Sequence, residues 1–384
     1  MEKLVFSSTC YFGSGAVSKL AEEISSRRFN KAFIITDEGI IASGIFQKVS
    51  NVLMKNKTLS VMFSDVSAEP TVSVVKNAYN RYKKSGADFI IAIGGGSPID
   101  TAKALSVIVT NPNYSDVVSL NGRVSDLSLP VPVFAIPTTA GSAAEVSRSF
   151  VISDEVMNRT IVSFNDKAVP IATFIDADFM LTMPDIVTLS SGFDAFTHAI
   201  ESLLSKNSNV FTRALAARAI NLVINNLPEC YDNPDNIVAR ENMAYAGYMA
   251  GLAYTNSGLG ICHSIAHAIS SRVQIQHGVA LGIALPAVLK FNMYSPAAPL
   301  YKDIAEAFGV STSGLTQDEI CRLAVRQVEK FRNQFNMPKK LSDYGIQEDE
   351  LDILALGAFD DVSTSSNPRQ VTMGGIYMIL RKIL

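Results

Sequence analysis

Residues 88–109, DFIIAIGGGSPIDTAKALSVIV, join a short apolar strand to a helix through three consecutive glycines. Glycine lets the backbone turn sharply and approach a ligand closely. A helix that begins after such a turn directs its free N–H groups and its dipole at whatever lies above it. Ser97 suits the cap of this helix and Pro98 its first position. The pattern predicts an anion site, most naturally for a pyrophosphate, with a tight turn that binds nothing as the alternative.

Similar strands alternate with helical segments through the first half of the chain. Apolar, β-rich runs occur at 31–36, 59–63, 88–93, 131–136 and 172–176. Strands that alternate with helices predict a doubly wound parallel sheet. Because these strands are apolar throughout, helices are expected on both faces of the sheet. The first half is therefore predicted to be a Rossmann-like α/β domain.

After residue 183 the pattern becomes helical. Periodicity predicts helices at 185–206, 210–226, 240–254, 261–271, 278–294 and 318–335. Pro228 is among the residues expected to mark helix ends. We therefore expect two domains, a dinucleotide-binding α/β domain over 1–183 and an all-helical, metal-binding domain over 184–384, in a chain long enough for both.

Composition excludes several classes of partner. The chain is 48% hydrophobic and 18% charged with a net charge of −3, values typical of a globular protein that binds neither nucleic acid nor an anionic membrane surface. We expect no secretory leader and no membrane span, because the apolar runs are strand-sized. The four cysteines are far apart, which favours reduced thiols and a cytoplasmic location.

Asp37 follows the strand at 31–36, at the edge of a parallel sheet where ligands bind. A carboxylate there can accept hydrogen bonds from the adenosine ribose hydroxyls and would repel a 2′-phosphate, which favours NAD over NADP. A helix cap for the following segment is an equally weighted alternative. A second loop, 137–145, places small hydroxyl residues after the strand at 131–136, where they can line a cofactor site.

All four histidines of the chain fall in one window of the helical half. Asp194 and His198 are four residues apart, as are His263 and His267, so each pair shares one helix face. His277 follows in the loop before the next helix. Such a cluster of mixed O and N donors predicts a site for Fe(II), Zn(II) or Mn(II) more readily than four unrelated structural histidines. We assign Asp194, His198, His263 and His277 as ligands and His267 as a proton relay.

Several motifs resemble the iron-containing (group III) alcohol dehydrogenases, in register from about residue 10 to about residue 300. They are GGGSPIDTAKA (94–104), IPTTAGSAAEVS (136–147), FIDADFM (174–180), GFDAFTHAIES (192–202), GLGICHSIAHAIS (258–270) and HGVALGIALP (277–286). The resemblance implies an NAD-binding domain and a helical domain, with NAD and metal in the cleft between them, and a homodimer or larger assembly. It also implies the same four metal ligands.

The resemblance further implies the positions that contact small molecules. The implied cofactor contacts are Asp37, Gly94, Gly95, Gly96, Ser97, Asp100, Thr138, Thr139 and Ser142. Ser149 and Tyr254 occupy positions that line the substrate pocket of relatives. Arg148 either meets an anionic substrate group or is structural.

These observations predict an NAD(H)- and metal-dependent alcohol dehydrogenase or aldehyde reductase that acts on a small alcohol or aldehyde, with Fe(II) expected and Zn(II) or Mn(II) as alternatives. An NAD- and metal-dependent lyase similar to dehydroquinate synthase is the main alternative. The few basic residues near the metal motifs disfavour it, since that enzyme handles a phosphorylated substrate. A non-catalytic scaffold is a second alternative, disfavoured by the intact metal set.

Overall fold

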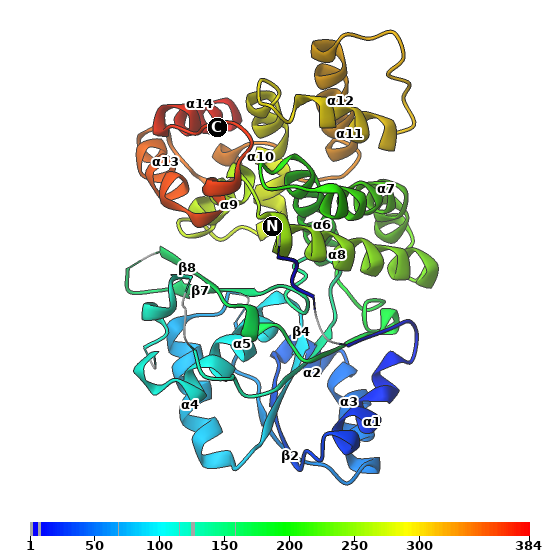
Figure 1. Ribbon diagram of the computed structural model, residues 1–384, viewed down its shortest axis with the longest axis vertical. Helices are drawn as coiled ribbons and strands as arrows, with labels where there is room; N and C mark the ends of the chain where they lie inside the picture. Colours follow the sequence, from blue (N-terminus) through cyan, green and yellow to red (C-terminus); the bar gives the residue numbers. More distant parts are fainter. Residues whose placement is uncertain (1–2, 7–8, 68, 115, 124–126, 158) are drawn as a thin grey trace. The chain divides into compact units, whose positions relative to one another are not determined.

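The structure is a computed structural model that describes residues 3–6, 9–67, 69–114, 116–123, 127–157 and 159–384. The chain divides into two compact units, Met1–Met183 and Pro184–Leu384. The first unit contains the strands and the second consists of helices (Figure 1). The predicted fold class, a Rossmann-like parallel sheet followed by an all-helical region, is confirmed.

Six parallel strands form the main sheet of the first unit, in the order β1-β9-β6-β4-β2-β3. Their bounds are β1 Cys10–Phe12, β2 Lys31–Ile35, β3 Leu59–Phe63, β4 Phe89–Gly94, β6 Val133–Pro137 and β9 Ala172–Ile175. The chain runs from β2 outward to β3 and then returns to β4 on the other side of β2. The direction of winding therefore reverses between β2 and β4, and in open α/β sheets ligands bind at the carboxyl ends of strands at such a reversal.

Helices cover both faces of this sheet, as its apolar strands predicted. Ala32 and Ile34 face one core with α1 (Leu20–Ser26) and α3 (Ile45–Lys55), whereas Phe33 and Ile35 face a second core with α4 (Val72–Ser85) and α5 (Gly96–Thr110). Figure 1 shows the two pairs of helices on opposite sides of the sheet. Burial on both faces explains why the strands do not alternate between apolar and polar residues.

A smaller three-stranded sheet was not predicted. It consists of β5 (Gly122–Arg123), β8 (Arg159–Phe164) and β7 (Ser149–Asp154), and β7 and β8 form an antiparallel pair. Alternate residues of β7 are buried, including Phe150 and Ile152. The sequence SFVISD does not show that alternation, because Val151 lies on the less buried face and Asp154 on the buried one.

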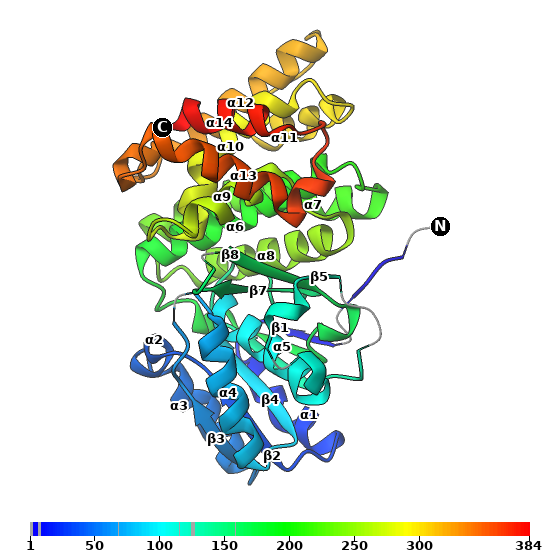
Figure 2. The ribbon, with the colours of Figure 1, turned by 90° about the vertical axis from the view of Figure 1, so that its left-hand side faces the viewer.

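The second unit contains helices only; all of residues 184–384 are described and none lies in a strand (Figure 2). Its α-helices are α6 Asp185–Leu204, α7 Val210–Asp232, α8 Ile237–Ser257, α9 Ile261–Ser270, α10 His277–Asn292, α11 Tyr301–Ala307, α12 Gln317–Arg332, α13 Leu351–Asp360 and α14 Met373–Ile383. The expectation that Pro228 marks a helix end is wrong, because α7 continues through it to Asp232. Packing along α6 and α8 sustains α7 despite the N–H that proline lacks.

Aromatic packing fixes α6, the helix that carries the first two candidate metal ligands. Phe193 and Phe196 on α6 contact Phe331 on α12 with ring centroids 5.8 and 5.1 Å apart. Aromatic pairs of this kind each contribute about 0.5–1.5 kcal/mol beyond the area they bury. In the part of the chain that the structure describes, no helix has the length and apolar character needed to cross a membrane.

Candidate active site

The face of α6 that points into the second unit presents Asp194 and His198 one helical turn apart. Both are buried, with 7% and 5% of their surface exposed. Nδ1 of His198 lies 3.4 Å from Oδ1 of Asp194. The imidazole of His198 stacks on His263, with centroids 4.5 Å apart, and on Tyr254, with centroids 4.4 Å apart. Spacing of four residues on one helix thus brings the predicted pair to one place.

The other histidines come from α9 and α10. His263 and His267 lie one turn apart on α9, and His277 is the first residue of α10, not a loop residue as expected. The start of α10 lies directly against α6, because the N–H of Gly278 donates to Oγ of Ser190 at 3.1 Å. A Cβ at Gly278 would lie 1.8 Å from the carbonyl oxygen of Ser190, so this close approach requires glycine.

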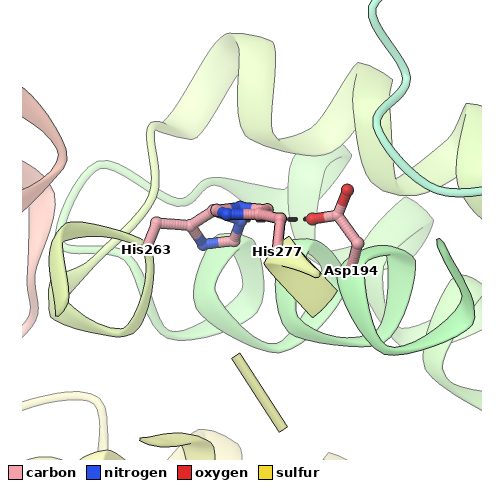
Figure 3. A group of neighbouring side chains, drawn as sticks. All are labelled: Asp194, His263 and His277. Carbon is pink, nitrogen blue, oxygen red and sulfur yellow. Dashed lines mark ion pairs between the residues drawn. The ribbon is translucent and has the colours of Figure 1, made fainter. Parts of the chain in front are cut away.

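Asp194, His263 and His277 form the centre of the cluster. Each offers a ligand atom, and these atoms lie within 4.8 Å of one another (Figure 3). Nε2 of His263 lies 3.5 Å from Oδ1 of Asp194. Both atoms are buried, and neither has a hydrogen-bond partner. Two donors bound to one ion about 2.1 Å away lie about 3.4 Å apart in tetrahedral geometry, so this spacing fits a divalent cation.

The protonation of the cluster also suits a cation. Burial would raise the pKa of Asp194, but the neighbouring imidazoles outweigh it and hold that pKa well below its ordinary value. Burial lowers the pKa of His277 to about 3, so its imidazole is neutral and has a lone pair for a metal. Burial would lower the pKa of His263, but Asp194 and Glu201 outweigh it and raise that pKa to about 9. A metal ion therefore competes with a proton at His263.

His267 belongs to the same group of rings but has its own carboxylate partner. Its ring stacks on His277 with centroids 5.3 Å apart. Nδ1 of His267 lies 2.8 Å from Oδ2 of Asp361, whose Oδ1 accepts a hydrogen bond from the N–H of Ser363 at 2.8 Å. Burial would raise the pKa of Asp361, but the charge and hydrogen bond of His267 and the contacts with Ser363 lower it to about 2.

The sequence interpretation missed two carboxylates behind these histidines. Glu201, whose contacts are described below, is three residues after His198 on α6, so helical spacing was a signal that could have identified it. Asp361 lies 94 residues after its partner His267. No local pattern links residues so far apart, and only the packing of α13 against α9 brings them together.

The glycine turn lies at the carboxyl end of β4, where the predicted cofactor residues converge. Gly94 has φ +146°, a conformation that favours glycine, and a Cβ there would lie 3.3 Å from Oδ2 of Asp37. A Cβ on Gly95 would lie 3.3 Å from the Thr139 side chain. A Cβ on Gly96 would lie 3.0 Å from Cβ of Ser142. The N–H of Thr138 donates to the carbonyl oxygen of Gly94 at 3.0 Å.

The helix after the turn begins two residues earlier than predicted. Gly95, in an extended conformation, is the N-cap of α5 and Gly96 its first residue. Ser97, predicted as the cap, therefore lies in the first turn, followed by Pro98. The N-terminus of α5 lies at the reversal of winding between β2 and β4, as a phosphate site requires.

Asp37 caps the five-residue helix α2 (Glu38–Ala42): its Oδ1 accepts a hydrogen bond from the N–H of Ile40 at 2.9 Å. The capping alternative is therefore observed. It is compatible with a cofactor contact, because Oδ2 of the same carboxylate lies on the side of Gly94.

Asp100 lies in a buried polar cluster with Lys103, which the sequence interpretation did not single out. Oδ2 of Asp100 accepts a hydrogen bond from the N–H of Val151 at 2.9 Å, and burial raises the pKa of Asp100 to about 6. Lys103 is fully buried, and its Nζ donates to the carbonyl oxygens of Ala144 and Ser149. The cluster thus ties α5 to the segment that carries Ser142 and Ser149. A lysine within the apolar helix TAKALSVIV was the signal for it.

The three predicted substrate residues differ in their surroundings. Tyr254 lies beside the metal cluster through its stacking on His198. Ser149 is the first residue of β7, and its carbonyl oxygen is bonded to Lys103. The guanidinium of Arg148 forms an ion pair with Asp166 at 3.3 Å, which is the structural alternative considered for this residue.

Comparisons with known proteins agree with this arrangement. Residues 7–177 match the family "Iron-containing alcohol dehydrogenase", and residues 188–384 match "Fe-containing alcohol dehydrogenase family, C-terminal". The lactaldehyde reductase of Escherichia coli K12 is 37% identical over 374 residues, and the NAD-dependent methanol dehydrogenase of Bacillus methanolicus is 32% identical over 376 residues. Each alignment covers 97% of this chain and 97% of the relative.

A crystal structure of 1,3-propanediol oxidoreductase superposes with a TM-score of 0.96 and 29% identity, covering 100% of both chains. Both family regions are matched in order, and the curated relatives align over nearly their whole length. The chain therefore belongs to the iron-containing alcohol dehydrogenase family, NAD-dependent oxidoreductases that act on CH–OH groups.

Proposed function

We propose that this chain interconverts a small alcohol and its aldehyde or ketone with NAD(H), using a divalent metal held by Asp194, His198, His263 and His277. The observation that carries the proposal is the pair formed by Nε2 of His263 and Oδ1 of Asp194. These buried atoms face each other at 3.5 Å without hydrogen-bond partners. A bound cation would satisfy both, and buried charges are otherwise costly.

The chain's own residues bind the ion and move the proton, whereas NAD(H) would exchange the hydride with the substrate carbon. When bound, a divalent ion provides Lewis acidity toward the alcohol or carbonyl oxygen. His267 accepts the proton that leaves the alcohol, or returns it in the reverse direction. Asp361 holds Nδ1 of His267, so that Nε2 is the atom that exchanges the proton.

We assign the cofactor to the turn after β4. The helix α5 directs its first N–H groups at a pyrophosphate, and Asp37 lies at the end of the neighbouring strand β2. Its carboxylate suits the ribose hydroxyls and disfavours a 2′-phosphate, so NAD is preferred over NADP. Gly94, Gly95, Gly96, Ser97, Asp100, Thr138, Thr139 and Ser142 complete the proposed site.

The substrate is proposed to be small and neutral. The relatives' names include a lactaldehyde reductase and a methanol dehydrogenase, whose substrates have few carbons. Arg148 is already paired with Asp166, which disfavours its use for an anionic substrate group. We further propose that Ser149 and Tyr254 line the substrate pocket, that the metal is Fe(II), and that the enzyme is a cytoplasmic homodimer or larger homo-oligomer.

An anaerobic assay of metal-stripped, full-length protein tests this function. NAD reduction by C2–C4 alcohols and NADH oxidation by the matching aldehydes are recorded with Fe(II), Zn(II), Mn(II) or no addition, and again with NADP(H). We expect turnover that requires added metal and is faster with NADH than with NADPH. Folded protein that binds NAD yet shows no net NADH formation with any metal would contradict the dehydrogenase and favour the lyase alternative.

A further inference from the structure

Glu201 is a buried carboxylate directly behind the proposed metal ligand His263. It lies on α6, seven residues after Asp194, and only 4% of its side chain is exposed. Its Oε2 lies 2.6 Å from Nδ1 of His263, and its Oε1 accepts a hydrogen bond from the N–H of Cys262 at 2.7 Å. The two oxygens of one carboxylate thus hold consecutive residues at the start of α9.

This contact determines which nitrogen of His263 carries a proton. An ionised carboxylate only accepts hydrogen bonds, so the hydrogen in the contact with Glu201 belongs to Nδ1. In the neutral ring, Nε2 then carries a lone pair and faces Oδ1 of Asp194. The lone pairs on these two atoms would repel each other, whereas a cation between them could bind both.

Charge balance leads to the same conclusion. Asp194 and Glu201 are both buried, and within the described residues their ion pairs are made with histidines and not with lysine or arginine. Once a metal replaces the second proton of His263, the two buried carboxylates lie beside neutral imidazoles, and a single divalent ion would offset their two negative charges.

The start of α9 leaves room for this carboxylate. A Cβ on Gly260 would lie 2.7 Å from Oε1 of Glu201 and 2.9 Å from Oδ1 of Asn367. Glycine at position 260 therefore allows Glu201 to reach Cys262 and His263 at the same time, and a larger residue would displace the carboxylate.

We propose that Glu201 is a positioning residue of the metal centre. Its carboxylate holds the proton of His263 on Nδ1, orients the ring so that Nε2 faces the ion, and strengthens the ligand by its negative charge. The inference rests on the proposed metal site and adds to it a residue that does not touch the ion.

Titration of full-length, metal-free protein with Co(II), in competition with a chelator, tests this role. We expect Glu201→Gln to bind Co(II) roughly 10–100-fold more weakly than wild type and to change the visible absorption of the bound ion. Glutamine keeps the size and one acceptor for Nδ1–H, but removes the charge and places an NH2 group opposite the N–H of Cys262. Glu229→Gln, at an exposed position on α7, is the matched control and should behave like wild type.

Gly260→Ala tests the same contact without changing a charge, and it carries the test alone if Glu201→Gln does not fold. We expect Gly260→Ala, like Glu201→Gln, to bind Co(II) more weakly than wild type, because the added Cβ displaces Oε1 of Glu201. Unchanged affinity and absorption in folded Glu201→Gln or Gly260→Ala, even with lowered thermal stability, would mean that Glu201 is only structural and would overturn this inference. Failure of the wild type to bind Co(II), or undiminished binding by Asp194→Asn, would instead overturn the proposed metal site, and the role of Glu201 with it.

Discussion

Asp194→Asn is expected to lose bound metal and to lower turnover by about a thousandfold. In Asp194, Oδ1 of the negatively charged carboxylate lies 3.5 Å from Nε2 of His263. Asparagine has nearly the same shape as aspartate but lacks this negative charge. Lewis-acid stabilisation by a metal is worth several kcal/mol, and each 1.36 kcal/mol is about tenfold in rate. Metal content per chain by plasma mass spectrometry and NAD reduction by a small alcohol measure the two losses together.

Asp185→Asn is the matched control, because it makes the same chemical change at the exposed beginning of the same helix. It should retain metal and turnover. Thermal unfolding of the metal-free proteins checks that both variants fold. An Asp194→Asn protein that is folded, free of metal and fully active would contradict the ligand assignment.

His267→Ala is expected to retain metal and to lower turnover by about 10²–10⁴-fold, the range typical of a lost general acid–base group. His267 contacts His277 through ring stacking but is proposed to transfer a proton and not to bind the ion. Because the pKa of Asp361 is lowered to about 2, its carboxylate stays ionised above that pH and continues to orient the imidazole. Metal content and the pH profile of kcat measure the effect.

Added imidazole provides an internal check on this prediction, since it can replace the missing proton acceptor and should restore part of the activity of His267→Ala. Asp361→Asn should show a smaller loss, because the histidine remains but its partner loses the charge. Turnover equal to wild type in His267→Ala would exclude the relay, and loss of metal from this variant would make His267 a ligand.

The pattern of apolar and polar residues was enough to predict those helices and strands whose structure depends mainly on their own residues. The apolar runs that became β2, β4, β6 and β9 are buried on both faces, and this two-sided burial made them recognisable. The edge strand β3 is largely exposed and was recognised from its apolar, β-rich sequence alone. In the helical unit, spacing of four residues was enough to place Asp194 with His198 and His263 with His267 on shared faces.

The remaining features depend on contacts between distant segments. Asp361 becomes relevant only because α13 packs against α9, and no local pattern in the last 80 residues indicates this. The ion pair between Arg148 and Asp166 also joins separate segments. It pairs the positive charge of Arg148, which the sequence alone could have assigned to binding an anionic substrate. Glu201 and Lys103 carried local signals, but a carboxylate or lysine on a helix is usually solvent-exposed, so burial revealed their roles.

Anomalous diffraction at the iron edge, from crystals of anaerobically Fe(II)-loaded protein, would locate the metal and its ligands. We expect a strong peak about 2.0–2.2 Å from Oδ1 of Asp194 and Nε2 of His263, with His277 and His198 as the other protein ligands. Active crystals with no peak at this position, or with the iron held by other residues, would contradict this assignment.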